Sequence, residues 1–176
     1  MSKKYVIKPA NNQDIPRIVQ LVNLAYRGGD AAGWTSEGAY LDGERTNAFM
    51  IAELMAKVDS VLLKAEEEAG LGGIVGCVYL EVEEGHLHLG TFAVDPGIQA
   101  QGLGRMMLAY ADEYALEHGF DAIYITVVSV RSELIEWYIR RGFEATGRRI
   151  PFPEQFGAPR MEVDFIEMRR RVPAAR

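Results

Sequence analysis

Apolar residues in the first half of the chain recur at helical spacing and then gather in short runs. The spacing of three and four between Ile15 and Val22 predicts a helix over residues 12–27, capped by Asn12 or Asp14. Polar, glycine-bearing separators divide the later apolar runs, which is typical of antiparallel hairpins. The other elements expected here are a strand at residues 5–7, a helix at 46–57, and strands at 60–65, 73–82 and His86–Val94.

After Pro96 the apolar spacing becomes helical again and predicts a helix over residues 101–118, which Gly119 ends. Ala122–Val128 is almost continuously apolar and β-branched, so we expect this strand to be buried on both faces. A strand, a helix and a strand in succession predict a parallel crossover. The last elements expected are a helix at residues 131–140 and strands at 143–149 and 161–169. This order predicts an α+β fold.

Length and charge narrow the class of protein. The 176 residues, 48% of them hydrophobic, are enough for one compact domain over the whole chain. Residues 1–95 hold 8 of the 19 basic and 14 of the 25 acidic residues, so the net charge of −6 belongs to that part. With no basic run longer than residues 169–171, the chain lacks the charge pattern of a nucleic-acid-binding protein.

The single cysteine, Cys77, cannot form an internal disulfide, which favours a reducing compartment. The basic start of the chain has no apolar stretch behind it, unlike a signal peptide. Apolar runs are also too short for a membrane span. We therefore expect a cytoplasmic protein with no membrane partner.

The segment around residues 94–106 carries the clearest chemistry. A strand ends, a glycine-bearing loop turns and a helix begins, so free backbone N–H groups and the positive helix end could bind an anion. A tight turn with no ligand would use the same glycines. Two common phosphate loops do not fit, since a Walker A loop needs Lys where Leu103 stands and a dinucleotide fingerprint needs Gly where Met107 stands.

Gln99-Ala100-Gln101-Gly102-Leu103-Gly104 resembles the acyl-CoA signature Gln/Arg-x-x-Gly-x-Gly/Ala of the GNAT superfamily of N-acyltransferases. A second block, residues 134–143 with Tyr138 four residues before Gly142-Phe143, resembles the family's helix after the central crossover. Two blocks in the matching strand and helix contexts make the resemblance specific. The order of elements over residues 5–169 is also similar, so it covers nearly the whole chain.

The resemblance implies a three-layer fold: a mixed, mostly antiparallel sheet with helices on both faces, splayed between its fourth strand, His86–Val94, and its fifth, Ala122–Val128. It also implies acetyl-CoA as the cofactor, with pantetheine in the notch and pyrophosphate on the helix N-terminus. The cofactor-binding residues expected from it are Phe92, Ala93, Val94, Gln99, Gln101, Gly102, Leu103, Gly104, Arg105, Met106 and Arg131.

Acyl transfer to an amine needs a base to remove a proton and an acid to protonate the leaving thiolate. Tyr138 stands at the family's Tyr position and is the predicted acid, although a Tyr packed under the sheet is the alternative. Arg131 stands where the family often has Asn. It could contact the cofactor, hold an acidic substrate group or pair with Glu133 or Glu136.

His88 is the predicted base, because it lies where some members of the family carry a catalytic Glu. Strand alternation would place it on the same face as Phe92 and Val94. A hydrogen-bonded sheet histidine is the alternative, and we expect no metal because too few further ligands lie near His86 and His88. Cys77 is expected to pack in the core, with a covalent acyl-cysteine step as the alternative.

The acceptor side is expected in the first loop region and in the proline-rich segment near the C-terminus. Aromatic walls with a carboxylate would suit an amine on an apolar body, although the same residues could simply pack in loops. The candidates are Trp34, Thr35, Glu37, Tyr40, Arg45 and Phe152, together with Glu154 and Phe156.

These observations predict an N-acetyltransferase that moves the acetyl group of acetyl-CoA to a primary amine of a small molecule or peptide by direct attack in a ternary complex. The acidic first half favours a cationic acceptor. The alternatives are a non-catalytic acyl-CoA-binding regulatory module and an enzyme of this fold with another acyl donor or acceptor. We expect no nucleic-acid partner, and a monomer or homodimer.

Overall fold

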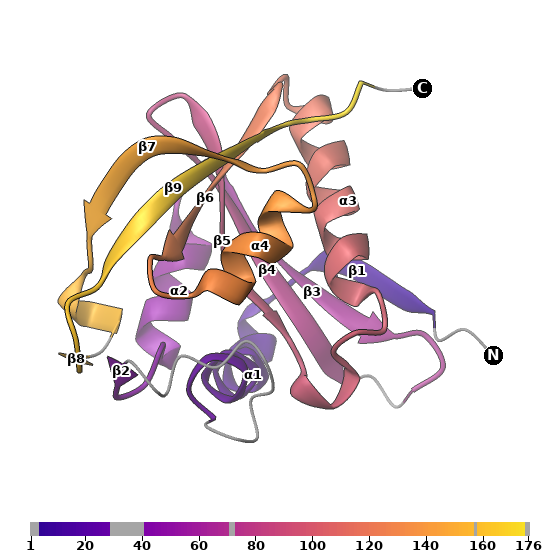
Figure 1. Cartoon of the computed structure of the whole chain (residues 1–176). Coiled ribbons are helices and arrows are strands. Elements are labelled where there is room, and N and C mark those ends of the chain that lie inside the picture. Colours follow the sequence, from indigo (N-terminus) through magenta and orange to yellow (C-terminus); the bar gives the residue numbers. More distant parts are fainter. Residues whose placement is uncertain (1–3, 29–40, 71–72, 157, 175–176) are drawn as a thin grey trace.

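A computed structural model describes residues 4–28, 41–70, 73–156 and 158–174 of the chain (Figure 1). Its main sheet has seven strands in the order β1-β3-β4-β5-β6-β9-β7, and β2 pairs with β8 in a small second sheet. The helices are α1 (Ile15–Arg27), α2 (Ala48–Ala56), α3 (Leu103–Glu117) and α4 (Ser132–Ile139), with short 3-10 turns at Asn12–Asp14, Pro96–Ile98 and Glu154–Phe156. The strands are β1 (Tyr5–Pro9), β2 (Leu41–Asp42), β3 (Ser60–Glu67), β4 (Ile74–Glu83), β5 (His86–Val94), β6 (Ala122–Val128), β7 (Glu144–Pro151), β8 (Ala158–Pro159) and β9 (Asp164–Arg171).

The main sheet is mixed and mostly antiparallel. β3, β4 and β5 form consecutive antiparallel hairpins, and β9 pairs antiparallel with both β6 and β7. Only β5 and β6, joined through α3, run parallel among the described strands. The predicted sheet and its parallel crossover are confirmed.

Helices lie on both faces of this sheet, as predicted (Figure 1). Buried residues of α1 and α2, such as Ile18 and Ile51, pack with Leu62 and Tyr79 of β3 and β4 in one cluster. A larger cluster on the opposite face joins α3 and α4 to the other side of the strands. In α3 the buried residues recur at helical spacing and are Leu103, Met107, Leu108, Ala111 and Ala115.

The predicted helix begins as the 3-10 turn Asn12–Asp14 and continues as α1. Asp14, one of the two predicted caps, is at the N-cap of α1, but its side chain makes no capping hydrogen bond there. Asn11 caps the 3-10 turn: its side chain accepts from Gln13 N–H at 2.9 Å, while Asp14 accepts from Asn11 N–H at 2.8 Å. Such a reciprocal pair satisfies two N–H groups that no helix carbonyl can reach. Asn11 and Asn12 look alike in sequence, so only the geometry distinguishes them.

The prediction that β6 is buried on both faces is wrong. Ile123, Ile125 and Val127 are buried against the layer of α3 and α4, but Tyr124 is half-buried and Thr126 is exposed. The reason is that α1 packs on β4 and β5, and α2 packs on β3, so neither helix extends over β6. Within the described part of the chain, neither α1 nor α2 therefore covers the second face of β6.

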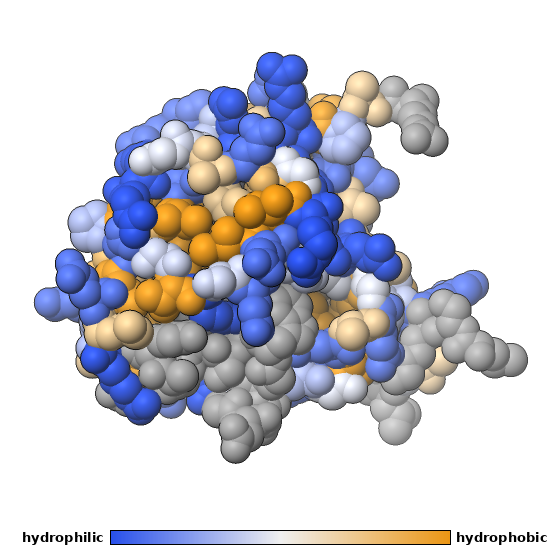
Figure 2. All heavy atoms as spheres, viewed as in Figure 1, coloured by the Kyte–Doolittle hydropathy of each residue, from blue (hydrophilic) through white to orange (hydrophobic). Residues whose placement is uncertain are grey.

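Surface hydrophobicity is uneven. In the space-filling view apolar residues gather over α4 and the strands beside it, ringed by hydrophilic ones (Figure 2), and Ile139 of α4 is 54% exposed. Within the described ranges, no helix combines the length and the apolar character needed to cross a bilayer.

Candidate active site

The N-terminus of α3 is built to receive an anion. Gly102 precedes the helix with a φ of +85°, a left-handed conformation that suits glycine. The N–H groups of Leu103, Gly104 and Arg105 come before the first helical hydrogen bond, which Met106 N–H donates to Gly102 C=O at 3.1 Å. No side chain caps this end among the described residues, so these three N–H groups and the helix dipole point outward.

Gly104 lies against two aromatic rings. A Cβ placed on it would lie 3.4 Å from Trp137 Cζ2 and 3.7 Å from Phe92 Cζ. The ring centroids of Phe92 and Trp137 are 6.2 Å apart. β5, α3 and α4 thus meet at one point, where a methyl group at Gly104 would be in ordinary van der Waals contact with both rings.

β5 contains a bulge in the middle of the predicted cofactor strand. Its pairing with β4 is interrupted so that Thr91 and Phe92 both stand opposite Val78, and Thr91 has a φ of +43°. A bulge of one residue exchanges the two faces of the strand beyond it. His88 faces the layer of α1 and α2, whereas Phe92 packs with the cluster of α3 and α4. The prediction that His88 and Phe92 share a face is therefore wrong.

β5 and β6 separate beyond their first residues. They pair at Leu87 with Ile123 and at His88 with Tyr124, and no later pair joins them in the described strands. The predicted splay between these two strands is confirmed, and it leaves the end of β5 with an open edge.

Phe92 and Val94 turn backbone polar groups toward this open edge. The Asp95 N–H donates to β4 at 2.8 Å, and antiparallel pairing alternates, so Val94 N–H and C=O point away from β4. The Val94 carbonyl accepts from the Gln99 amide at 3.4 Å, and the Phe92 carbonyl accepts from the Tyr26 hydroxyl at 2.5 Å. This edge can therefore hydrogen-bond an extended ligand.

A cavity of about 170 Å³, here called the notch, joins the open edge of β5 to the N-terminus of α3. Most of the residues predicted to bind the cofactor line it: Phe92, Val94, Gln99, Gly102, Leu103, Gly104 and Arg105. Tyr26, Ile98, Ala100, Leu134, Trp137, Tyr138 and Arg141 complete its wall.

Four residues predicted to bind the cofactor do not line the notch. Ala93 is buried with the layer of α1 and α2, because the bulge turns it to that side. Gln101 is exposed and accepts from the Tyr5 hydroxyl at 3.4 Å, and Met106 is 40% exposed with its N–H used inside the helix. Arg131 is buried at the N-cap of α4, outside the notch.

Arg141 is a site residue that sequence reasoning missed. Its guanidinium lies 3.6 Å from the centroid of the Trp137 ring and donates to the Trp137 carbonyl at 2.9 Å, while its Nε has no hydrogen-bond partner among the residues that the structure describes. Burial, followed by the nearby charges of Arg105 and Arg140, lowers the pKa of Arg141. Two arginines facing one notch without a carboxylate between them favour a polyanion there. The only sequence signal was an arginine one turn after Trp137.

Tyr138 lies where the notch meets a second, larger cavity, because it lines both. It is 6% exposed, and its ring packs edge-on against Trp137 and Phe143. Burial, reinforced by Tyr26, raises the pKa of Tyr138 well above its usual value, while Arg131 and Arg141 oppose this. The phenol therefore keeps its proton at neutral pH and can donate it.

The larger cavity, of about 780 Å³, is here called the acceptor cavity. Of the predicted acceptor residues, Arg45, Phe152 and Phe156 line it, whereas Glu154 does not; Trp34, Thr35, Glu37 and Tyr40 lie outside the described residues. Its wall also holds aromatic and acidic residues not predicted from sequence: Tyr26, Phe49, Phe165, Glu53, Glu81, Glu83, Glu84 and Glu167.

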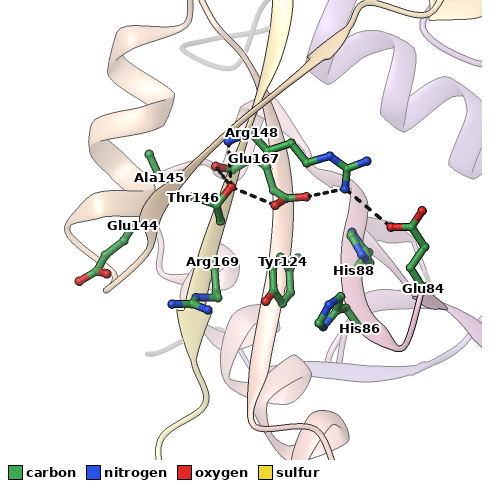
Figure 3. Close-up of a pocket in the computed structure, with 10 residues that line it drawn as sticks. All are labelled: Glu84, His86, His88, Tyr124, Glu144, Ala145, Thr146, Arg148, Glu167 and Arg169. Carbon is green, nitrogen blue, oxygen red and sulfur yellow. Dashed lines mark hydrogen bonds and ion pairs between the residues drawn. The ribbon is translucent and has the colours of Figure 1, made fainter.

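His88 also lines the acceptor cavity. It lies near the start of β5, before the bulge. A third cavity, of about 370 Å³, lies on the other side of His88 and is shown with its lining residues in Figure 3. The rings of His86 and His88 lie 4.5 and 5.5 Å from that of Tyr124. His88 is thus a histidine of the sheet that also lines a cavity. Its position is compatible with a catalytic base and with a purely structural histidine.

Cys77 is fully buried, and its thiol donates to the Thr91 carbonyl at 3.4 Å. Burial raises the pKa of this thiol to about 12, so it is not ionised at neutral pH. A covalent acyl-cysteine step is therefore not supported. Within the described ranges no three His, Cys, Asp or Glu side chains converge as a metal site.

Comparison with known proteins places this geometry in context. The model of the acetyltransferase (GNAT) family matches residues 16–143. A search of curated proteins finds no match.

Solved structures share the fold at low identity. The ribosomal-protein-S18-alanine N-acetyltransferase of Escherichia coli superposes with a TM-score of 0.68 at 18% identity, covering 98% of this chain and 96% of that one. Ard1 of Thermoplasma volcanium gives 0.70 at 16%, covering 97% and 99%. The protein yncA of Salmonella typhimurium, solved with its cofactor acetyl-CoA, gives 0.65 at 19%, covering 97% and 95%.

Proposed function

Because the chain belongs to the GNAT acetyltransferase family and its cofactor is acetyl-CoA, we propose that it transfers the acetyl group to a primary amine of a small molecule or peptide by direct attack in a ternary complex. One observation carries the proposal: the notch and the acceptor cavity meet at Tyr138, a buried phenol that lines both.

The notch fits the cofactor by its own chemistry. The N–H groups of Leu103, Gly104 and Arg105 would hold the pyrophosphate, with charge added by Arg105 and Arg141. The edge of β5 at Phe92 and Val94 would pair with the amides of pantetheine. When bound there, the cofactor supplies a thioester carbonyl, so that a C–N bond forms and the C–S bond breaks.

Proton transfer is assigned to two side chains. Tyr138 would donate its proton to the leaving sulfur, because the protonated phenol lies where the notch and the acceptor cavity meet. His88 would accept the proton of the attacking amine through water, because it lines the acceptor cavity but lies beyond the bulge.

The charge of the acceptor cavity supports a cationic acceptor. Among the described residues, five glutamates line it, against the three basic side chains of Arg45, Lys57 and Arg148. Lys57 is already paired with Glu81 at 3.0 Å, and the Arg45 guanidinium lies 4.0 Å from the centroid of the Phe156 ring. We also propose a cytoplasmic location, in keeping with a single buried, free cysteine.

The test is thiol release from acetyl-CoA in the presence of a panel of amines. Steady release that depends on one class of amine is expected, and Tyr138→Phe should abolish most of it. Binding of acetyl-CoA without release from any amine would instead indicate a regulatory binding module. The same assay with longer acyl-CoAs and with alcohols tests donor and acceptor type.

A further inference from the structure

The third cavity continues the acceptor cavity across the open face of the sheet. Both are lined by the same four charged or titratable residues: Glu84, His88, Arg148 and Glu167. No helix covers this face of β6, β9 and β7 in the described part of the chain. An acceptor that enters beside Tyr138 can therefore extend along the strands toward these residues.

Glu167 is a buried carboxylate in the middle of this face. Its side chain is 8% exposed, and its Oε1 accepts from the Thr146 hydroxyl at 2.9 Å (Figure 3). Its Oε2 faces Arg148 Nη1 at 3.5 Å, longer than the 2.7–2.9 Å usual for a charged hydrogen bond. Burying a carboxylate costs free energy unless both oxygens have close partners. The long contact of Oε2 with Arg148 offsets this cost only in part.

Arg148 shows that a cation fits between two carboxylates here. The same Nη1 atom lies 3.5 Å from Glu167 and 3.7 Å from Glu84, which places it between β9 and the turn that joins β4 to β5 (Figure 3). The Arg148 side chain is 56% exposed and lies where the pairing of β7 with β9 is irregular. The position between Glu167 and Glu84 is here called the seat. Arg148 occupies it without a close ion pair, so a cation with better geometry can replace it.

An apolar stretch of the acceptor cavity separates this seat from Tyr138, where the proposed acetyl transfer takes place. Phe165 lies two residues before Glu167 on the same face of β9, about 7 Å along the strand. Its ring is 5.2 Å from Phe152, and both rings line the acceptor cavity. A short alkyl chain against these rings would join the reacting amine to the seat.

We propose that the acceptor carries a second cationic group, an ammonium or guanidinium, which binds between Glu167 and Glu84 and displaces Arg148. This rests on the proposed function and names its substrate class: small diamines and amines with a distal guanidinium. Glu167 is a specificity-determining residue here, and it touches neither the acetyl group nor the attacking amine.

The experiment compares matched amines. With acetyl-CoA saturating, kcat/KM is measured for 1,4-diaminobutane, 1,5-diaminopentane and 1,6-diaminohexane and for n-alkylamines of the same lengths. We expect at least one diamine to exceed its matched monoamine by tenfold or more, and Glu167→Gln to reduce that ratio about tenfold. Glu113→Gln removes the same charge from α3, on the opposite side of the sheet, and should leave the ratio unchanged.

A second variant gives an effect of opposite sign. Arg148→Met removes the internal cation and should raise the diamine ratio several-fold. Diamine-to-monoamine ratios near one at every length would overturn the proposal by showing no subsite. A preference for 6-aminohexanoate that Arg148→Met removes would overturn it by showing an anion subsite.

Direct binding separates this proposal from the proposed function. Calorimetric titration with the diamines should show binding that weakens about tenfold in Glu167→Gln and in Glu84→Gln, with unchanged melting temperatures as the check of folding. Such binding without acetylation of any amine would overturn the proposed function but keep the subsite. Acetylation of amines without Glu167-dependent discrimination would keep the function and overturn the subsite.

Discussion

Tyr138 and Arg141, one turn apart on either side of the end of α4, have different roles in the proposed reaction. Tyr138 lines both the notch and the acceptor cavity, where the proposal places the leaving sulfur. Arg141 lines the notch but not the acceptor cavity, and its guanidinium lies on the Trp137 ring. Substitutions at the two positions should therefore separate turnover from cofactor binding.

Tyr138→Phe removes the proposed acid and keeps the packing of the ring. We expect kcat to fall about 100-fold, within the range usual for a general acid, with KM for acetyl-CoA changed less than about threefold. Burial raises the pKa of Tyr138, so the protonated, active form persists as pH rises through 9 and is lost only above the ordinary tyrosine value. Thiol release measured from pH 6 to 10 checks both points, and a wild-type alkaline limb near pH 8 that Tyr138→Phe abolishes would contradict them.

Arg141→Met should weaken acetyl-CoA binding about tenfold, equivalent to about 1.4 kcal/mol, and leave kcat nearly unchanged. The reason is loss of a charge that faces the notch beside Arg105. Arg140→Met is the matched control, since Arg140 is exposed and does not line the notch. Calorimetric titration measures both, and equal losses would show a general charge effect instead.

Cys77→Ala tests the buried thiol. Turnover should persist, because a thiol with a pKa of about 12 is not a nucleophile at neutral pH. The unfolded thiol ionises near pH 8.5 and the folded one does not, so the wild type should lose stability as pH rises above 8.5. At pH 10 this loss is about 2 kcal/mol, and Cys77→Ala should lack it in urea unfolding. Equal pH profiles of the two proteins would refute the effect.

At the scale of elements, the bulge in β5 and the N-terminus of α3 shape the site together. The bulge turns Phe92 toward α3 and α4 while His88 stays on the other face. The left-handed turn at Gly102 then starts α3 directly beside that ring. Both elements are therefore needed to form the notch proposed for the cofactor.

Substitution of the two glycines at this helix start should give opposite effects on stability. Gly102→Ala puts a side chain at a φ of +85° and should lower the free energy of unfolding by about 1 kcal/mol. Gly104→Ala has helical geometry and an ordinary contact with Trp137 at 3.4 Å, so it should be neutral or stabilise by up to about 1 kcal/mol. Urea unfolding checks the signs, and a stabilising Gly102→Ala would contradict the left-handed turn.

At the scale of the whole molecule, the cavities proposed for the two ligands differ in charge. Most of the residues that line the notch lie in the neutral second half of the chain, whereas the net charge of −6 belongs to residues 1–95. β3, β4 and β5 bring acidic side chains such as Glu81 and Glu83 into the acceptor cavity. The cavity proposed for the acceptor is thus acidic, and the notch proposed for the cofactor is basic.

This division predicts a salt effect on the acceptor. KM for a cationic amine should rise several-fold between 20 and 300 mM salt, because exposed charges are screened beyond about 10 Å at 0.1 M. Glu83→Gln and Glu53→Gln together should lower that dependence. Steady-state kinetics at constant pH measures it, and a salt-independent KM would contradict attraction by the cavity's charge.

The sequence by itself determined the local elements, the family and the anion-binding turn, because these depend on residues close together in the chain. Spacing placed α3 and β5, and the block from Gln99 to Gly104 carried the resemblance. Much of the predicted notch follows from that one block.

Only the tertiary structure decided which faces these elements present. One extra residue at Thr91 exchanged the faces of β5, and the short reach of α1 and α2 left β6 open on one side. The seat between Glu84 and Glu167, and the notch wall that Arg105 shares with Arg141, bring together residues 36 or more positions apart. Such contacts depend on strand register and on layer packing, which no periodicity along the chain records.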